Sequence, residues 1–140
     1  MQLPVKAHYA TLAMLALADK HESREVLPAR VIACEQGIPS QFLGQILQQL
    51  RAAGLIASTR GANGGFYLEQ PPAAITLSEV VHAVCPPSSS LAVEGASPLS
   101  AVVLDVWEEL KEQQQQLLQR LTLADLLARL DTSANVMFYI

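Results

Sequence analysis

A sharp reversal of the chain near its middle limits the possible folds more than any other feature. Three glycines lie within residues 61–65, in the run Arg60-Gly61-Ala62-Asn63-Gly64-Gly65. The runs on either side, Leu55-Ile56-Ala57-Ser58-Thr59 and Phe66-Tyr67-Leu68, have the composition of short strands. Because glycine reaches the backbone conformations that tight turns need, this pattern predicts a two-stranded hairpin.

Two short helices are predicted immediately before the hairpin. Residues 28–36 predict a first helix that stops at Gly37, since glycine often closes helices in a left-handed conformation. A second helix is predicted from Ser40 to about residue 53 and ends at Gly54. Its apolar stripe consists of Phe42, Leu43, Ile46, Leu47 and Leu50. Two short helices around a tight turn are the sequence form of a helix-turn-helix, and a hairpin directly after them is a wing.

A further helix is predicted on each side of this region. Residues 5–18 are rich in Ala and Leu, which favour helices, and Pro4 suits a first turn. The buried face of this helix is expected to consist of Val5, Tyr9, Leu12 and Ala16. Beyond the hairpin, Thr76 and Glu79 form a capping box that opens a helix to about Val84.

The second half of the chain predicts an extended helical arm. A Pro/Ser-rich loop at residues 85–97 precedes a long helix over residues 98–121. Thr122 and Asp125 repeat the capping signature, so a last short helix is expected to end near residue 130. The tail at residues 136–140 is apolar and is expected to pack against the protein.

Together these elements predict a mainly α-helical protein with a small β-hairpin, in which a winged helix-turn-helix head carries a long dimerisation helix. The predicted divisions are a DNA-binding domain at 1–84, a Pro/Ser-rich loop at 85–97, the dimerisation helix and following short helix at 98–130, and an apolar tail at 131–140. A chain of 140 residues can bury about two-thirds of its unfolded surface, so its fold needs no metal or disulfide.

The distribution of charge is more informative than the net charge of −4, which argues against a polyanionic partner. Residues 1–70 hold six basic and five acidic residues, a net charge of +1, whereas residues 71–140 hold three basic and eight acidic residues, a net charge of −5. No apolar run is long enough to cross a bilayer, and the N-terminus lacks a secretion signal. With only two cysteines, we expect a cytoplasmic protein with free thiols and no membrane partner.

Polar side chains on the second helix of the helix-turn-helix are candidate DNA contacts. The amides of Gln41 and Gln45 can pair with the edge of adenine in the major groove, since both lie near the start of the helix. Gln48 and Gln49 are expected to be ordinary surface residues. Arg51 is expected to contact a phosphate, with an intramolecular ion pair as the alternative.

The wing supplies a second set of candidate contacts. Arg60 is expected to enter a minor groove, and Asn63 to donate to a base or a phosphate. Gly61, Gly64 and Gly65 would let the backbone approach phosphates without a clash of side chains. An ordinary hairpin turn also favours Gly and Asn, but the position after a helix-turn-helix favours the DNA-binding interpretation.

The long helix carries an apolar stripe that the head is too small to cover. Its members recur at spacings of three and four residues, with Gln113 as a polar interruption. The candidate dimerisation residues are Leu99, Val103, Val106, Leu110 and Leu117. Pairing with a second copy would cover them and place two reading heads on one face of DNA. Packing against residues 5–18 of the same chain is the alternative, and we expect both.

Metal-binding and catalytic signals are sparse. His82 and Cys85 are three residues apart at a helix end, a spacing that can bring two ligands together, but His8 and His21 are scattered. The favoured interpretation is that no metal or cofactor binds. If a metal does bind, Cys85 is the one candidate ligand. Cys34 lies among apolar neighbours and is expected in the core. No nucleophile with its base and no phosphate-binding loop occurs, so the sequence does not predict an enzyme.

Several motifs resemble the Rrf-two family of bacterial transcriptional regulators, of the IscR, NsrR and CymR type. The resemblance is clear over residues 1–84 and looser in the long helix, and the end of the chain again looks like CymR-type members. It is carried by Lys6-Ala7-His8-Tyr9-Ala10, Gln36-Gly37-Ile38-Pro39, Phe42-Leu43, Ile46-Leu47, Leu50-Arg51-Ala52-Ala53-Gly54-Leu55-Ile56, Arg60-Gly61-Ala62-Asn63-Gly64-Gly65-Phe66, Pro71-Pro72-Ala73-Ala74-Ile75-Thr76-Leu77 and Met137-Phe138-Tyr139-Ile140.

The resemblance implies a winged-helix head, a long dimerisation helix and binding to operator DNA near promoters. By position it implies that Tyr9, Gln45 and Arg51 contact phosphates and that Ser40 and Gln41 face the major groove. It also implies that Arg60 and the turn at 61–65 enter the minor groove.

One departure from the family pattern concerns cysteines. Members of the family that bind an iron–sulfur cluster resemble one another in carrying three cysteines in the loop before the long helix. Here that loop has one cysteine, Cys85, at its edge. The sequence therefore favours a homodimeric, sequence-specific, cluster-free repressor of the CymR type, controlled by a regulatory protein or a small-molecule effector and linked to sulfur or iron metabolism.

Two alternatives remain open. One is an iron–sulfur or redox sensor in which Cys85 acts with His or carboxylate ligands. The other is a dimeric protein-interaction module that does not bind DNA, which the low positive charge suggests.

Overall fold

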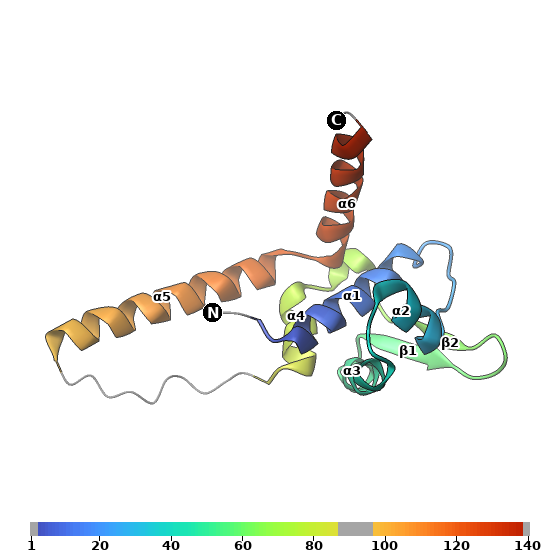
Figure 1. The fold of residues 1–140 in the computed structure, drawn as a ribbon, viewed down its shortest axis with the longest axis horizontal. Coiled ribbons are helices and arrows are strands. Elements are labelled where there is room, and N and C mark those ends of the chain that lie inside the picture. The colour runs from blue at the N-terminus through green and yellow to red at the C-terminus, as the bar shows by residue number, and fades with distance from the viewer. Residues whose placement is uncertain (1–2, 87–96, 139–140) are drawn as a thin grey trace.

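The computed structural model describes residues 3–86 and 97–138, with side chains described as far as Leu130. Most of the chain is helical, and its two strands form one antiparallel hairpin (Figure 1), as the sequence predicts. In chain order the elements are α1 (Val5–Asp19), α2 (Ala29–Gln36), α3 (Ser40–Ala52), β1 (Ile56–Thr59), β2 (Gly65–Leu68), the 3-10 turn η1 (Pro72–Ala74), α4 (Leu77–Val84), α5 (Pro98–Arg120) and α6 (Leu123–Phe138). Within the described ranges no helix has both the length and the apolar character of a membrane span.

Helix α1 lies at the centre of the head and packs against α2, α3, α4 and β2. Its buried face differs from the predicted one, because Val5 is 53% exposed and Tyr9, Leu12 and Ala16 are only partly buried. The buried residues are Ala7, Ala10, Ala13, Met14, Leu17 and Ala18. Four of these six are alanines, whose small side chains let neighbouring helices approach the α1 backbone closely, so small rather than large residues mark the core side.

The hairpin is joined to the rest of the head by a third short segment. Strands β1 and β2 pair in the register Ile56 with Leu68 and Thr59 with Gly65. The loop before α2 adds a bridge to β2, since Leu27 and Phe66 exchange backbone hydrogen bonds of 3.0 and 2.8 Å. Leu27, Ile56 and Leu68 are buried in the common core, so the base of the wing is fixed to the head. The tip of the wing extends beyond this core.

A pair of capping motifs joins the head to the arm. The predicted capping box at Thr76 and Glu79 is present, and Thr122 and Asp125 exchange the same two hydrogen bonds. Hydrogen bonds from the backbone and the side chain of Thr122 lower the pKa of the Asp125 carboxyl. The two motifs lie side by side, because Thr76 and Thr122 form an antiparallel bridge.

This bridge determines where the long helix leaves the head. The Leu77 amide donates to the Leu121 carbonyl at 2.9 Å, and the Leu123 amide donates to the Ile75 carbonyl at 3.0 Å. Leu123 and Ile75 are completely buried beside this bridge. The end of α5 is therefore fixed to the start of α4 by main-chain bonds and core packing together.

Helix α5 extends from the head as an arm (Figure 1), and none of its residues is buried. At 1.5 Å per residue its 23 residues span about 35 Å. It packs against α4, whereas α6 packs against α1. The predicted contact between the arm and the first helix is therefore made by α6 in place of α5.

Helix α6 is longer than predicted, since it continues past residue 130 to Phe138. Residues 131–138 contain no glycine or proline that would end a helix. The apolar tail at 136–140 is predicted to pack against the protein, but the side chains of these residues are not among those described.

Candidate nucleic-acid interface

Helix α3 has one buried and one exposed face. Leu43, Ile46, Leu47 and Leu50 are buried in the core of the head. Gln41, Gln45 and Gln48 are exposed, and their spacing of four and three residues places them on one face. Ser40 is the first residue of the helix and is also exposed. The core contacts of the apolar face therefore hold a row of amide side chains toward solvent.

Phe42 does not belong to the buried stripe in which the sequence analysis placed it. It is 43% exposed, and its ring packs edge-on against Tyr9 with ring centroids 6.0 Å apart. One residue of a helix turns by about 100°, so Phe42 lies on the flank of α3 that faces α1 rather than beneath it. This aromatic pair brings Tyr9 beside α3, where the resemblance places a phosphate contact.

Two residues of α3 that were not singled out lie on or beside its exposed face. Gln48 is exposed, as predicted, and its spacing also places it in the row of Gln41 and Gln45. Gly44 lies between them, in the middle of the helix, where a glycine is unfavourable. A Cβ at Gly44 would meet no protein atom within 4 Å, so no packing requirement explains the missing side chain.

The last turn of α3 is tied to the wing. An Arg51 guanidinium nitrogen donates to the Ser58 hydroxyl of β1 at 3.3 Å. Arg51 is exposed, and no other described residue bonds its remaining N–H groups, so the bond to Ser58 orients the side chain without neutralising its charge. Arg51 therefore bonds the neutral Ser58 hydroxyl, whereas the alternative was an intramolecular ion pair.

The tip of the wing presents Arg60, Gly61 and Asn63 to solvent. Gly61 has a φ of +114°, a conformation that residues with side chains rarely adopt, so the turn itself requires glycine here. Arg60 carries the one positive charge of the turn, and its side chain makes no hydrogen bond or ion pair with the described residues.

The other two glycines of the wing have internal roles. The Gly64 amide donates to the Gly61 carbonyl at 3.0 Å, and the Gly65 amide donates to the Thr59 hydroxyl at 3.3 Å. Gly65 is buried and belongs to β2. Both N–H groups are therefore used within the fold, and an approach of the backbone at 64 and 65 to phosphates stays a prediction.

Gly65→Ala is expected to destabilise the protein by about 1–3 kcal/mol, because the new Cβ would lie 2.5 Å from the carbonyl carbon of Leu27. Denaturant unfolding followed by circular dichroism would measure this loss. Gly44→Ala is the matched control, since its Cβ meets open space. Equal stability of the two variants would show that the contact with Leu27 does not constrain position 65.

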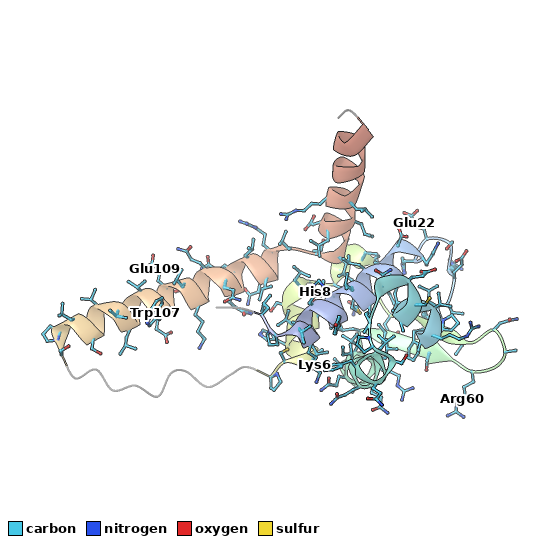
Figure 2. All side chains as sticks on the ribbon, in the orientation of Figure 1. Lys6, His8, Glu22, Arg60, Trp107 and Glu109 are labelled. Carbon is cyan, nitrogen blue, oxygen red and sulfur yellow. The ribbon has the colours of Figure 1, made fainter. Side chains whose placement is uncertain are left out.

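Helix α3 and the wing are neighbours in the head, since α3 is followed directly by β1 and Arg51 of α3 donates to Ser58 of β1. In the view of Figure 1, α3 and the hairpin both lie along the lower edge of the molecule. Figure 2 shows Arg60 and Lys6 on this lower side, whereas Glu109 lies on the upper side of α5. Glu109 on the arm therefore lies away from Arg60 at the wing tip.

The candidate dimerisation residues are exposed along α5. Leu99 is 79% exposed, and Val103, Val106, Leu110 and Leu117 are all between 44% and 47% exposed. Val102 and Trp107, which the sequence analysis left out, are also exposed apolar residues on this helix. A helix with this much exposed apolar surface indicates an interaction surface.

The surroundings of Cys85 do not form a metal site within the described residues. Cys85 is partly buried and packs against the core, whereas His82 is exposed and its Nδ1 lies 3.2 Å from the Ser78 hydroxyl. The described residues contain no group of three His, Cys, Asp or Glu side chains that could hold a metal ion. Cys34 is exposed rather than in the core, because it lies on the opposite side of α2 from buried Ile32.

The chain resembles known regulators along nearly its whole length. Residues 3–129 match the model of the Rrf2 (Rrf-two) family, which is described as an iron-dependent transcriptional regulator. An HTH-type transcriptional regulator of Mycobacterium tuberculosis is 35% identical over 130 residues, which cover 89% of this chain and 80% of the relative. The HTH-type transcriptional regulator CymR of Bacillus subtilis is 31% identical over 142 residues, which cover all of both chains.

Solved structures agree with these matches. CymR of B. subtilis, the global cysteine regulator, superposes with a TM-score of 0.81 at 28% identity, covering 92% of this chain and 98% of that one. IscR of T. potens superposes with a TM-score of 0.79 at 29% identity, covering 95% and 90%. The amide-lined helix and the wing therefore occur in the fold of DNA-binding regulators, and the chain belongs to the Rrf2 family of winged helix-turn-helix transcriptional regulators.

Proposed function

We propose that this protein is a homodimeric, cluster-free repressor that binds operator DNA with α3 in the major groove and Arg60 in an adjacent minor groove. The observation that carries the proposal is the exposed row of Gln41, Gln45 and Gln48 on α3, a helix that is tied to the wing by the hydrogen bond from Arg51 to Ser58. Amides can read adenine edges, and an arginine is favoured in a narrow minor groove.

Residues around these two elements complete the proposed contact surface. Ser40 and Gln41 lie at the start of α3 and face the bases, while Gln45 and Arg51 reach the phosphates. Tyr9 adds a phosphate contact from α1, where its ring packs next to Phe42. At the wing tip, Asn63 and the backbone of Gly61 lie beside Arg60. The surface has few positive charges, so its affinity for phosphate alone is modest and two heads are needed.

The faces of α5 support a second copy of the chain as its partner. Partly buried residues such as Leu104, Gln115 and Leu118 lie toward the head, where Gln115 donates to the buried Ser78 hydroxyl at 2.9 Å. The apolar row of Val103, Val106 and Leu110 lies on another side of the helix, and Asp105 and Glu109 lie on a third. Pairing two α5 helices through the apolar row would bury it while the acidic sides stay in water.

Gly44 is explained by this docking. A glycine in the middle of the exposed face of α3 lets the helix backbone approach the floor of the groove more closely than any other residue would. Gly44→Ala is expected to stabilise the free protein by about 1 kcal/mol, because alanine favours helices, and to weaken operator binding about tenfold. Denaturant unfolding and fluorescence anisotropy with labelled operator would measure the two effects. Unchanged affinity in the stabilised variant would remove Gly44 from the interface.

The cysteine content supports a regulator without an iron–sulfur cluster. The chain has two cysteines, of which Cys34 lies on α2 and Cys85 at the end of α4, so a set of three thiolates from one chain does not exist. Regulation then comes from a protein partner or a small molecule. Because the match to CymR covers both chains completely and that protein is named a global cysteine regulator, we place the regulated genes in sulfur metabolism and the protein in the cytoplasm.

The proposal is tested by mapping the genomic sites that the protein occupies in cells and measuring its affinity for the recovered sequence at several salt concentrations. A palindromic site bound by two copies, with an affinity that falls as salt rises, is the expected result. Transcription of the adjoining genes should rise when the regulator is removed. A protein that captures a partner but binds no DNA fragment would instead be an interaction module.

A further inference from the structure

A cavity of about 280 Å³ lies in the head between the loop that follows α1 and strand β2 of the wing. Its apolar walls come from Leu17, Val26 and Leu68. Leu17 and Leu68 are almost completely buried, so this side of the cavity is part of the core. His21, Arg24, Glu25 and Tyr67 complete the lining. The volume is near the lower end of the range of small-molecule sites and suits a compact metabolite.

The charged residues of this lining have no partners of their own. Within the part of the chain that the structure describes, no hydrogen bond or ion pair engages the side chains of Arg24 and Glu25. The two residues are adjacent in sequence, yet they are not paired with each other. A guanidinium, a carboxylate and an apolar wall are thus available together at one cavity.

The backbone at Arg24 is also unusual. Arg24 is the one residue other than glycine with a positive φ in the described ranges, at +57°. That conformation is costly for a residue with a side chain, and the turn is held by a hydrogen bond of 3.1 Å from the Arg24 amide to the His21 carbonyl. Glycine or asparagine would adopt this backbone conformation at lower cost. The presence of arginine at position 24 is therefore explained by its guanidinium group and not by the turn.

We propose that this cavity binds a free amino acid with an apolar side chain, which acts as a co-repressor. The α-carboxylate would pair with the planar guanidinium of Arg24, and the α-ammonium with the carboxylate of Glu25. The apolar side chain would lie mainly against Val26 and the Tyr67 ring, which are more accessible than Leu17 and Leu68. Opposite charges separated by one carbon, beside an apolar group, are the defining features of such a molecule and match the lining group by group.

The position of the cavity couples it to the DNA-binding wing. Tyr67 lines the cavity and pairs across the hairpin with Ala57, which adjoins Ser58, the acceptor of the Arg51 hydrogen bond. The loop on the other wall leads to Leu27, which bridges to Phe66 of β2. A ligand held between loop and strand would restrict the wing to one position and so raise the operator affinity.

Binding is measured first on the full-length protein without DNA, so its outcome is independent of the proposed repressor function. L-leucine, L-methionine and L-phenylalanine are titrated separately by calorimetry, and saturable binding of at least one is expected. Leucinamide, which lacks the carboxylate, and N-acetyl-L-leucine, which lacks the ammonium, should each bind at least about tenfold more weakly than L-leucine. Absence of saturable binding of all three amino acids at about 10 mM would overturn the proposal.

Variants then distinguish a loss of ligand binding from a loss of folding stability. Arg24→Gly removes the guanidinium and relieves the backbone, so the unfolding temperature should be unchanged or higher while affinity for the amino acid falls at least about tenfold. Glu25→Gln should weaken binding similarly. Glu35→Gln, at an exposed position of α2, is the matched control that should bind as the wild type does. An Arg24→Gly protein with wild-type affinity would overturn the proposed carboxylate contact. Operator affinity that does not rise with saturating amino acid would overturn the role as a co-repressor.

Discussion

A protein carrying Val106→Glu and Leu110→Glu together is expected to be a folded monomer with an operator affinity at least about 100-fold below that of the wild type. The two side chains are 45% and 46% exposed and lie in the middle of the apolar row on α5. Carboxylates there would face their counterparts in the second copy, where burial of unpaired charge is costly. The two heads would then bind independently, and the gain from linking two half-sites would be lost.

Sedimentation velocity would measure the mass of this variant, and fluorescence anisotropy its affinity for the operator. The helical signal in circular dichroism should be retained, because both residues already face solvent in the single chain. A protein with Gln116→Glu and Gln119→Glu is the matched control, since it adds the same charge at exposed positions elsewhere on α5. A double variant that sediments as a dimer and binds normally would place the interface elsewhere.

Arg60→Ala is expected to weaken operator binding by about 10- to 100-fold, which corresponds to the 1–3 kcal/mol of a specific arginine contact with DNA. Folding stability should change little, because Arg60 is exposed at the wing tip and the adjacent turn is formed by other residues. Anisotropy titrations at two salt concentrations measure the loss and show whether the slope against salt also falls.

Two further variants separate charge from shape at this position. Arg60→Lys keeps the positive charge but is more strongly hydrated, so it should recover only part of the affinity if the side chain enters a narrow minor groove. Arg120→Ala removes one positive charge from the last turn of α5, outside the proposed contact surface, and is the control for a general change in charge. Arg60→Ala binding as tightly as the control would exclude the wing from the interface.

The reading head was largely predictable from sequence because its signals are local. Glycine positions marked the end of α2 and the wing, and Gly37 indeed has a φ of +66°. The stripe of Leu43, Ile46 and Leu47 defined the buried side of α3. The capping residues Thr76 and Glu79 located the start of α4. Each of these features depends on residues within a few positions of one another, so hydrogen bonding and helical geometry are enough to predict it.

Features that depend on residues far apart in the chain were predicted poorly. The buried face of α1 was misassigned, because the helices around it select its alanines rather than its larger residues. The lack of room for a side chain at Gly65 was not predicted, because it depends on contact with Leu27, which lies far away in the sequence. Cys34 was expected in the core, although α2 turns that side outward.

The sequence by itself therefore determined the winged helix-turn-helix head, the amide row on α3, Arg60 at the wing and the absence of a three-cysteine set. Only the tertiary structure decided that α6 rather than α5 packs on α1, that α5 is left with an uncovered apolar row, and that Arg24 and Tyr67 line one cavity. The physical reason is that periodicity and turn chemistry are properties of neighbouring residues. Which helix faces are buried, and which stay exposed, depends on how all the elements pack together around one core.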